Sequence, residues 1–263
     1  MLSRFVGQSE AKDVLCRMAH RSFFSLTAPA HHGKNFMVAC FSEEFNLSLY
    51  RVPDSKVESL REMELKSMSV SCPTVFVLSA PHIPSLSQSF LLKFTESMPE
   101  RCKLVVCVPT VYQLMPAVRS RVCPIRFGTY TKDELLQFTS DERVLRYADS
   151  PGLIMAMSDI DLVAYEARAE LVVNSIAAAS LPNVLKILSI IKEGHEDLFL
   201  LILMKVCGYR MRDNLDIPIC SAIVRVIGRH KSALALSSIN RRAVFDAMFL
   251  DMRDEARACL RKN

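Results

Sequence analysis

The stretch TAPAHHGKNF, near the start of the chain, contains the glycine-lysine pair of a phosphate-binding loop. A working loop reads G-x-x-x-x-G-K-S/T. Its backbone amides converge on the phosphates, its lysine reaches the β- and γ-phosphates, and its hydroxyl binds Mg²⁺. Gly33 and Lys34 are kept here. Three positions depart from the pattern: Ala28 replaces the first glycine, His31 occupies a small-residue position, and Asn35 replaces the hydroxyl. We therefore predict a degenerate loop in which Gly33 and Lys34 are weak or vestigial phosphate contacts.

Hydrolysis of a nucleoside triphosphate also needs acidic residues at the end of a second strand, where they hold the metal and orient water. The matching apolar run TVFVL ends instead in Ser79-Ala80-Pro81. We therefore expect no hydrolysis by this chain alone. Lys34 could bind a phosphate weakly or pair with a nearby acid, and we favour the acid.

His31 and His32 could be read as metal ligands, but adjacent residues rarely point at one ion. No cluster of cysteine and histidine with the spacing of metal ligands lies nearby in the sequence, so we predict no metal site.

Composition indicates a globular protein of two or three small domains. The chain has 263 residues, half of them hydrophobic, and a formal net charge of +5. Nine cysteines without a CxxC pair argue against a disulfide framework or a closed zinc site and favour a reducing, cytoplasmic setting. The first residues carry charges where a signal peptide would be apolar, and the run LFLLILM is too short to span a bilayer. We expect a soluble protein without membrane contact.

Hydrophobic patterning divides the chain in two. Up to about residue 127, short apolar runs alternate with helical patterns. Strands are predicted at 22–28, 73–80 and 102–109, and helices at 10–20, 36–45, 54–69 (helix or connector) and 85–98. This alternation predicts a parallel sheet with helices on both faces.

The second half lacks strand signals. Thr131 and Glu134 have the spacing of a capping box, and helices are predicted at 161–180, 183–194, 196–211 and 241–260. In the last of these, residues spaced three and four apart predict a core or subunit-contact stripe: Phe245, Met248, Phe249, Met252 and Ala256. We divide the chain into an α/β domain at 1–127, a small helical domain at 128–160 and an all-helical domain at 161–263.

The segment from Ser89 to Phe127 resembles the part of clamp-loader AAA+ subunits that reads A-L-L-K-x-L-E-E-P-P, a strand, and then L-x-x-T-I-x-S-R-C. Other stretches resemble the family in the same order: Val6-Gly7-Gln8 with Ala11 and Leu15, Ala148 to Gly152, and Ile239-Asn240-Arg241. The matching positions in the long segment are Leu91, Leu92, Lys93, Glu96, Pro99, Leu114, Arg119, Ser120 and Arg121. Val122 stands where the family has the cysteine of Ser-Arg-Cys.

Among clamp-loader subunits the chain is most similar to the bacterial-type delta-prime subunit, which also has a worn phosphate loop and no acidic hydrolysis motif. Two departures from active subunits agree with this. Gly152 stands where their lid carries a nucleotide-sensing arginine, and Val108 stands where their first sensor is polar. The four-cysteine zinc module common in bacterial members is missing, which suggests a compact version.

The resemblance implies an AAA+ domain at 1–127, a lid at 128–160 and a collar at 161–263. It further implies a non-hydrolysing stator that offers Arg121, beside Ser120, as an arginine finger to the γ-phosphate held by a neighbour. No bound cofactor is expected in this chain, and ATP and Mg²⁺ belong to neighbouring subunits. The implied partners are the other subunits of a hetero-pentamer, a sliding clamp, and primer-template DNA through phosphate contacts.

Alternatives stay open. From the residues alone, Arg119, Arg121 and Arg126 are more simply a solvated basic edge. The chain could also be an ATP-binding, hydrolysing clamp-loader subunit with relocated metal ligands, or an AAA+-derived helical adaptor without a role in replication. DNA contact could involve Arg17, Arg21 or Lys93, but no aromatic-basic pattern marks a dedicated surface.

Overall fold

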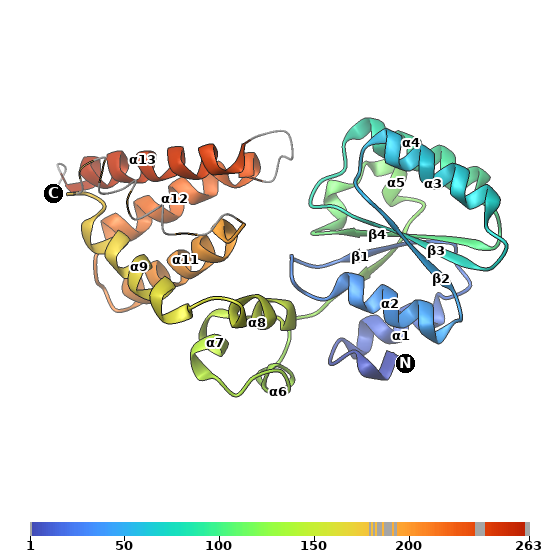
Figure 1. Ribbon diagram of the computed structural model, residues 1–263, viewed down its shortest axis with the longest axis horizontal. Coiled ribbons are helices and arrows are strands. Elements are labelled where there is room, and N and C mark those ends of the chain that lie inside the picture. Colours follow the sequence, from blue (N-terminus) through green and yellow to red (C-terminus); the bar gives the residue numbers. More distant parts are fainter. Residues whose placement is uncertain are drawn as a thin grey trace. The chain divides into compact units, whose positions relative to one another are not determined.

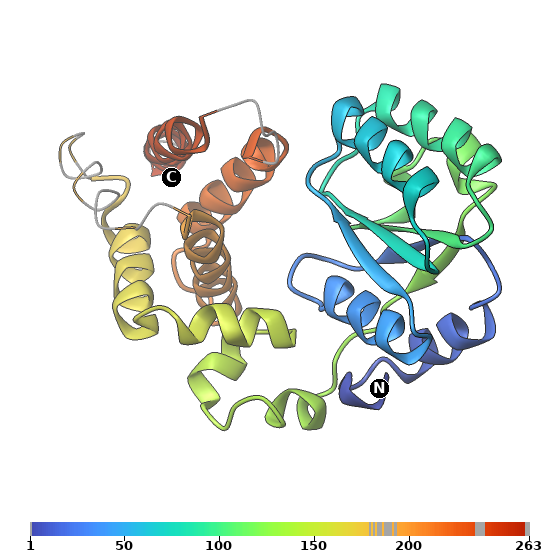
Figure 2. The same cartoon turned by 45° about the vertical axis from the view of Figure 1, so that its right-hand side comes forward.

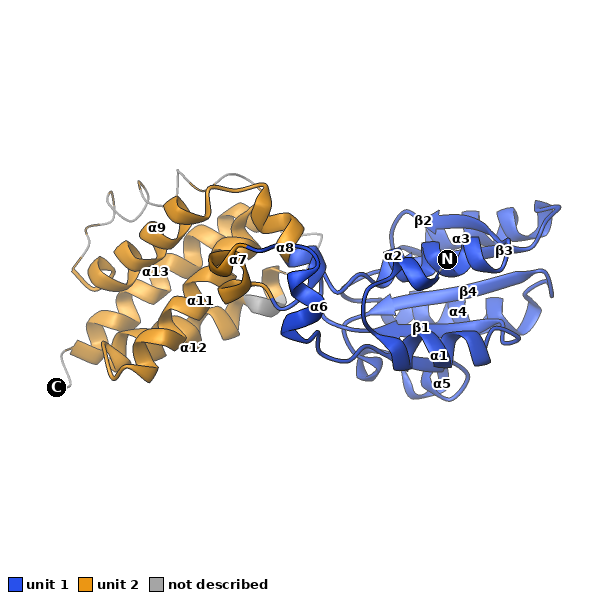
Figure 3. Cartoon of the chain, turned by 90° about the horizontal axis from the view of Figure 1, so that it is seen from below, with its two compact units in different colours: residues 1–140, 149–153 blue, residues 141–148, 154–263 orange. Residues whose placement is uncertain are grey.

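The computed structural model describes residues 2–178, 180, 182, 186, 191, 194–234 and 240–260. Two compact units are present. One comprises residues 1–140 and 149–153, and the other comprises 141–148 and 154–263 (Figure 3). The segment 128–160 is thus shared between the units, and the domain boundaries inferred from the sequence stay predictions.

The first unit is built on a five-stranded sheet in the order β2-β3-β4-β1-β5, and all four strand pairs are parallel. The strands are β1 (Phe23–Thr27), β2 (Ser48–Val52), β3 (Thr74–Ser79), β4 (Cys102–Val108) and β5 (Cys123–Arg126). All five residues of β1 are buried, as expected for a central strand of a parallel sheet that is covered on both faces.

Helices cover both faces of this sheet, as predicted. In Figures 1 and 2, α3, α4 and α5 lie on one face, and α1 and α2 lie on the other. The helices of this unit are η1 (Leu2–Arg4), α1 (Ser9–Arg17), α2 (Lys34–Glu44), α3 (Val57–Ser69), α4 (Ser85–Ser97), η2 (Val111–Gln113), α5 (Pro116–Arg119) and α6 (Lys132–Leu136). On each face of the sheet, a hydrophobic cluster packs between the strands and the helices. Leu60, Leu91 and Val118 belong to one, and Leu15 and Phe41 belong to the other.

Several local predictions are confirmed. The runs at 22–28, 73–80 and 102–109 form β1, β3 and β4, the three central strands. The capping box at the start of α6 is present: the Glu134 amide donates to Thr131 Oγ1 at 3.3 Å, and the Thr131 amide donates to Glu134 Oε2 at 2.7 Å. The edge strands β2 and β5 were not predicted.

The described elements of the second unit are all helical. They are α7 (Glu142–Tyr147), α9 (Leu162–Ser175), α11 (Glu196–Arg212), α12 (Ile217–Leu234) and α13 (Arg241–Leu260), and α8 (Pro151–Ser158) begins in the first unit and ends in the second. α11 packs against α9 and α12, and α12 packs against α13. The whole stripe predicted on α13 is buried, and Phe245 and Phe249 pack with Phe199 of α11. Most of the helix predicted at 183–194 lies outside the described residues.

No helix in the described part of the chain is both long and apolar enough to cross a membrane.

Candidate functional site

The loop between β1 and α2 holds its lysine inward. Lys34 Nζ donates to the carbonyl oxygens of Ala28 and Pro29, at 2.6 Å each. Burial lowers the pKa of the Lys34 ammonium. The expectation that Lys34 pairs with a nearby acid is therefore wrong: the partners of its ammonium are carbonyls of its own loop.

Three contacts from outside the loop fix three consecutive residues. The His31 carbonyl, at a positive φ of 64°, accepts from the Gly152 amide at 3.0 Å. The His32 carbonyl accepts from the Tyr130 hydroxyl at 3.0 Å. Gly33, which caps α2 at a φ of 79°, lies under the Phe5 ring, so that a Cβ there would be 3.1 Å from the ring.

At Gly152 the resemblance implies that a nucleotide-sensing arginine is missing, and the structure shows how little space is left there. A Cβ at Gly152 would approach the His31 carbonyl oxygen to 2.3 Å, a distance that real Cβ atoms do not show. The chain therefore has no room for any side chain at this position while the loop keeps its conformation.

The cleft beside the loop has a volume of about 550 Å³. Its lining contains no carboxylate among the residues that the structure describes: Ala30, His31, His32, Gly33, Lys34, Asn35, Phe36, Ser79, Ala80, Pro81, Cys107, Pro109 and Gly152. Burial raises the pKa of the Cys107 thiol to about 12, so the thiol is protonated and uncharged at neutral pH. Val108 is buried in the core on the side of α4 and does not line the cleft. This set of residues does not fit a magnesium-bound triphosphate. It offers neither a carboxylate nor a pair of hydroxyl groups for the metal, and the Lys34 ammonium donates to carbonyls of the loop.

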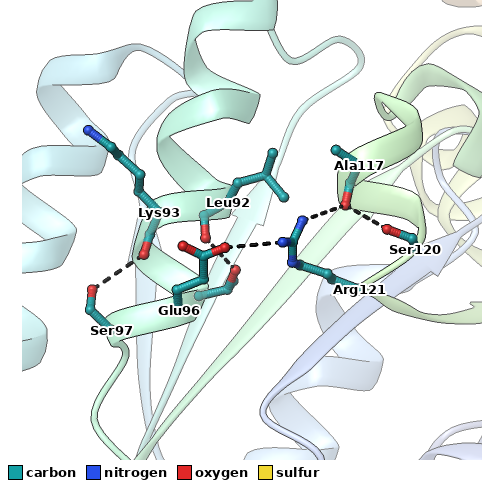
Figure 4. Close-up of polar contacts among 8 residues, drawn as sticks. Leu92, Lys93, Glu96, Ser97, Ala117, Ser120 and Arg121 are labelled. Atoms are coloured by element: carbon teal, nitrogen blue, oxygen red, sulfur yellow. Dashed lines mark hydrogen bonds and ion pairs between the residues drawn. The ribbon is translucent and has the colours of Figure 1, made fainter.

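Arg121 lies in the turn between α5 and β5 and points to α4. Its Nη2 donates to Glu96 Oε1 at 3.1 Å, and its Nη1 donates to the Ala117 carbonyl at 3.4 Å (Figure 4). Ser120 Oγ donates to the same carbonyl at 3.0 Å. The Arg121 and Glu96 side chains are 48% and 60% exposed. The arginine is thus oriented by an acid while its guanidinium stays open to solvent.

The phosphate-loop cleft and Arg121 lie at opposite edges of the sheet. The loop follows β1, whereas Arg121 precedes β5 and Glu96 lies in the helix that precedes β4. Because all strands are parallel, the first position is at the carboxyl ends of the strands and the second is at the amino ends. In register, Cys123 is opposite Phe24, four residues before the loop begins at Ala28. At about 3.3 Å per residue, this places Cys123, two residues after Arg121, on the order of 13 Å from the loop along the strands.

No protein family model and no curated protein sequence matches this chain. Solved structures do. A DNA polymerase III gamma subunit-related protein from Thermotoga maritima is 10% identical, with a TM-score of 0.54, over 95% of this chain and 100% of that one. A RuvB mutant from Thermotoga maritima is 15% identical, with a TM-score of 0.50, over 80% of each chain. Both are AAA+ proteins. The fold of this chain is an AAA+ fold.

Within the AAA+ fold, the basic residues considered for DNA contact do not share a surface. Arg17 and Arg21 lie at the end of α1 and just after it, whereas Lys93 lies on α4, and these helices cover opposite faces of the sheet. All three side chains are exposed.

Two features of this AAA+ fold were not assigned a role from the sequence. Glu96 was matched only as part of a motif, and its contact with Arg121, 25 residues away, could be found only from the structure. Tyr112 was not singled out at all. Its ring lies under the Arg119 guanidinium, which is 5.5 Å from the ring centroid.

Proposed function

We propose that this chain is a non-hydrolysing, delta-prime-like subunit of a sliding-clamp loader that donates Arg121 to the ATP site of a neighbouring subunit. The observation that carries this proposal is the position of Arg121: exposed, held by Glu96, and at the sheet edge opposite the chain's own loop. An arginine in that place is available to another chain rather than to its own cleft. The AAA+ fold and the similarity to a gamma subunit-related protein support the same assignment.

Arg121 would stabilise the negative charge that develops as the γ-phosphate is transferred on the neighbour. Arginine fingers contribute ~10³-fold or more to the rate of such reactions. Glu96 acts as a positioning residue, because a guanidinium already held in one orientation loses less rotamer freedom on binding. Ser120 Oγ and Arg121 Nη1 both donate to the Ala117 carbonyl, which ties the two side chains of the motif to the end of α5.

The chain's own loop would be a structural remnant. Its lysine donates to two carbonyls of the loop, its middle residues are held by Gly152 and Tyr130, and its cleft offers no acid for a metal among the described residues. These contacts favour the stator over a hydrolysing ATPase subunit. ATP and Mg²⁺ would be bound by the neighbours only.

The helices outside the sheet would take the remaining roles of a clamp-loader subunit. We assign α6, α7 and α8 to the lid and the helices from α9 to α13 to the collar that holds the ring of subunits together. The partners would be the other subunits of a hetero-pentamer, a sliding clamp and the phosphates of primer-template DNA.

Affinity purification of the tagged chain from its source cells, followed by native mass spectrometry, tests this proposal. We expect a five-subunit assembly that contains at least one relative with an intact G-x-x-x-x-G-K-S/T loop. A monomer, or an assembly without such a relative, would contradict the stator function and leave the adaptor as the better account.

Calorimetric titration of the isolated chain with MgATP separates the stator from the ATPase alternative. We expect no heat of binding at micromolar protein. Micromolar affinity would favour the ATPase alternative.

A further inference from the structure

Two residues before Arg121, Arg119 is held by an aromatic ring instead of an acid. Arg119, the last residue of α5, stacks on Tyr112 of η2 with 5.5 Å between its guanidinium carbon and the ring centroid. Tyr112 is 72% exposed, one of the most exposed large apolar side chains in the described part of the protein. A single exposed ring is ordinary on a protein surface, and what distinguishes this one is the arginine held over it.

The backbone that carries this pair is well anchored. Val111 and Leu114, on either side of the Tyr112 position, are buried in the core cluster on this face of the sheet, as is Val118 next to Arg119. Thr110 caps η2, and its Oγ1 accepts from the Tyr112 amide at 3.4 Å. The two side chains are therefore presented outward from a fixed support.

The charges around Arg119 and Tyr112 indicate what chemistry a partner of this pair would have. Arg121 is neutralised locally by Glu96, but Arg119 forms no ion pair with any residue that the structure describes. A guanidinium held over a ring by a cation–π contact does not use its N–H donors in that contact, and those donors match a carboxylate in bidentate geometry. Tyrosine and arginine are also the residue types that most often dominate binding energy at protein interfaces.

We propose that Tyr112 and Arg119 form a docking surface for a carboxylate-bearing patch on the neighbouring subunit that receives Arg121. This inference rests on the proposed function, since Arg119 lies only two residues before the finger, Arg121. It gives the two arginines separate roles: Arg119 with Tyr112 holds the neighbour, and Arg121 acts on the nucleotide that the neighbour binds.

A protein partner fits this surface better than a nucleic acid does. Phosphate tracking requires several free cations along one surface. Here Arg121 is paired with Glu96. Of the residues considered for DNA, only Lys93 on α4 lies on the same face of the sheet as Arg119, whereas Arg17 and Arg21 lie on the opposite face.

The test compares Tyr112→Ala and Arg119→Ala with wild type in the purified assembly. The control is Leu65→Ala on α3, which removes an equally exposed side chain away from this surface. Native mass spectrometry across a dilution series gives the dissociation constant, and turnover is measured on the fully assembled fraction. We expect each variant to weaken assembly about tenfold and to keep the turnover of assembled complexes, whereas the control assembles like wild type. Arg119→Lys should not restore affinity, because an ammonium lacks the planar bidentate edge.

Wild-type assembly by Tyr112→Ala and Arg119→Ala would overturn this inference. So would loss of binding to a fluorescent primer-template duplex with unchanged assembly, which would make the surface a nucleic-acid contact. Neither result would affect the proposed function, which depends on Arg121 and on recovery of an ATPase neighbour. Failure to recover that neighbour with the wild-type chain would instead remove both.

Discussion

The ion pair between Arg121 and Glu96 is weak enough to be exchanged. Both side chains are about half exposed, and surface pairs of this kind contribute about 0.2–1 kcal/mol. A triphosphate carries more charge than one carboxylate and offers several oxygens, so it can replace Glu96 as the partner of the guanidinium. Glu96 therefore orients the arginine without sequestering it.

Substitution of Glu96 tests this positioning role. Glu96→Ala should lower the ATP turnover of the assembly about two- to fivefold, the equivalent of a weak exposed pair, and Glu96→Gln should have a smaller effect because its amide oxygen still accepts. Glu100→Ala, which removes another exposed acid nearby, serves as the control. If the alanine variant turns over faster than wild type, Glu96 competes with the phosphate rather than positioning Arg121.

Lys34 illustrates what residue types alone cannot show. Its pairing with two carbonyls of its own loop depends on backbone conformation, which no side-chain pattern encodes. We expect Lys34→Ala to lower the free energy of unfolding by about 1–2 kcal/mol, because two carbonyls lose a charged donor in a partly exposed loop. Turnover of the assembly should not change. Denaturant titration and a turnover assay check both parts, and lost turnover with unchanged stability would point to nucleotide binding at this loop.

At the scale of elements, the centre of the sheet could be predicted from the sequence and its edges could not. β1, β3 and β4 are buried on both faces and read as continuous apolar runs. β2 and β5 have a neighbour on one side only, so β2 tolerates exposed Ser48 and Arg51, and β5 tolerates Pro124. Their apolar signal is correspondingly short.

Among the helices, too, the features that could be predicted are those set by a local sequence pattern. The stripe on α13 and the capping box of α6 were predicted because each rests on spacing along one helix. The contacts that pin the phosphate loop, from Gly152, Tyr130 and Phe5, join segments far apart in the chain. Such contacts follow from the tertiary fold.

The close approach of α8 to the loop predicts a specific sensitivity. Gly152→Ala should lower the free energy of unfolding of the α/β unit by about 1–3 kcal/mol, because its Cβ would overlap the His31 carbonyl. Gly208→Ala on α11 is the matched control. It has open space around the new methyl group and should raise stability by up to about 1 kcal/mol. Thermal melts of the two variants check this. Equal melting temperatures would show that the close contact between Gly152 and His31 does not contribute to stability.

At the scale of the whole molecule, the fold places the loop after β1 and Arg121 at opposite ends of the strands of one parallel sheet. The carboxyl ends carry the loop whose lysine donates to its own carbonyls, and the amino ends carry the exposed Arg121 paired with Glu96. The order of motifs along the sequence indicated this fold, and the solved structures agree at 10–15% identity. The sequence could not indicate that Glu96 meets Arg121, since that contact depends on α4 and α5 lying side by side on one face of the sheet.

The most direct test of this account is the steady-state ATP turnover of the purified assembly carrying Arg121→Ala, in the presence of clamp and primed DNA. Native mass spectrometry of the same preparation confirms that the subunits are all present. The control is Arg126→Ala, which removes an exposed arginine from the opposite, carboxyl end of β5. We predict an intact assembly whose turnover falls at least about tenfold with Arg121→Ala and stays near wild type with Arg126→Ala. Wild-type turnover by a fully assembled Arg121→Ala complex would contradict the finger role and return Arg121 to a solvated basic edge.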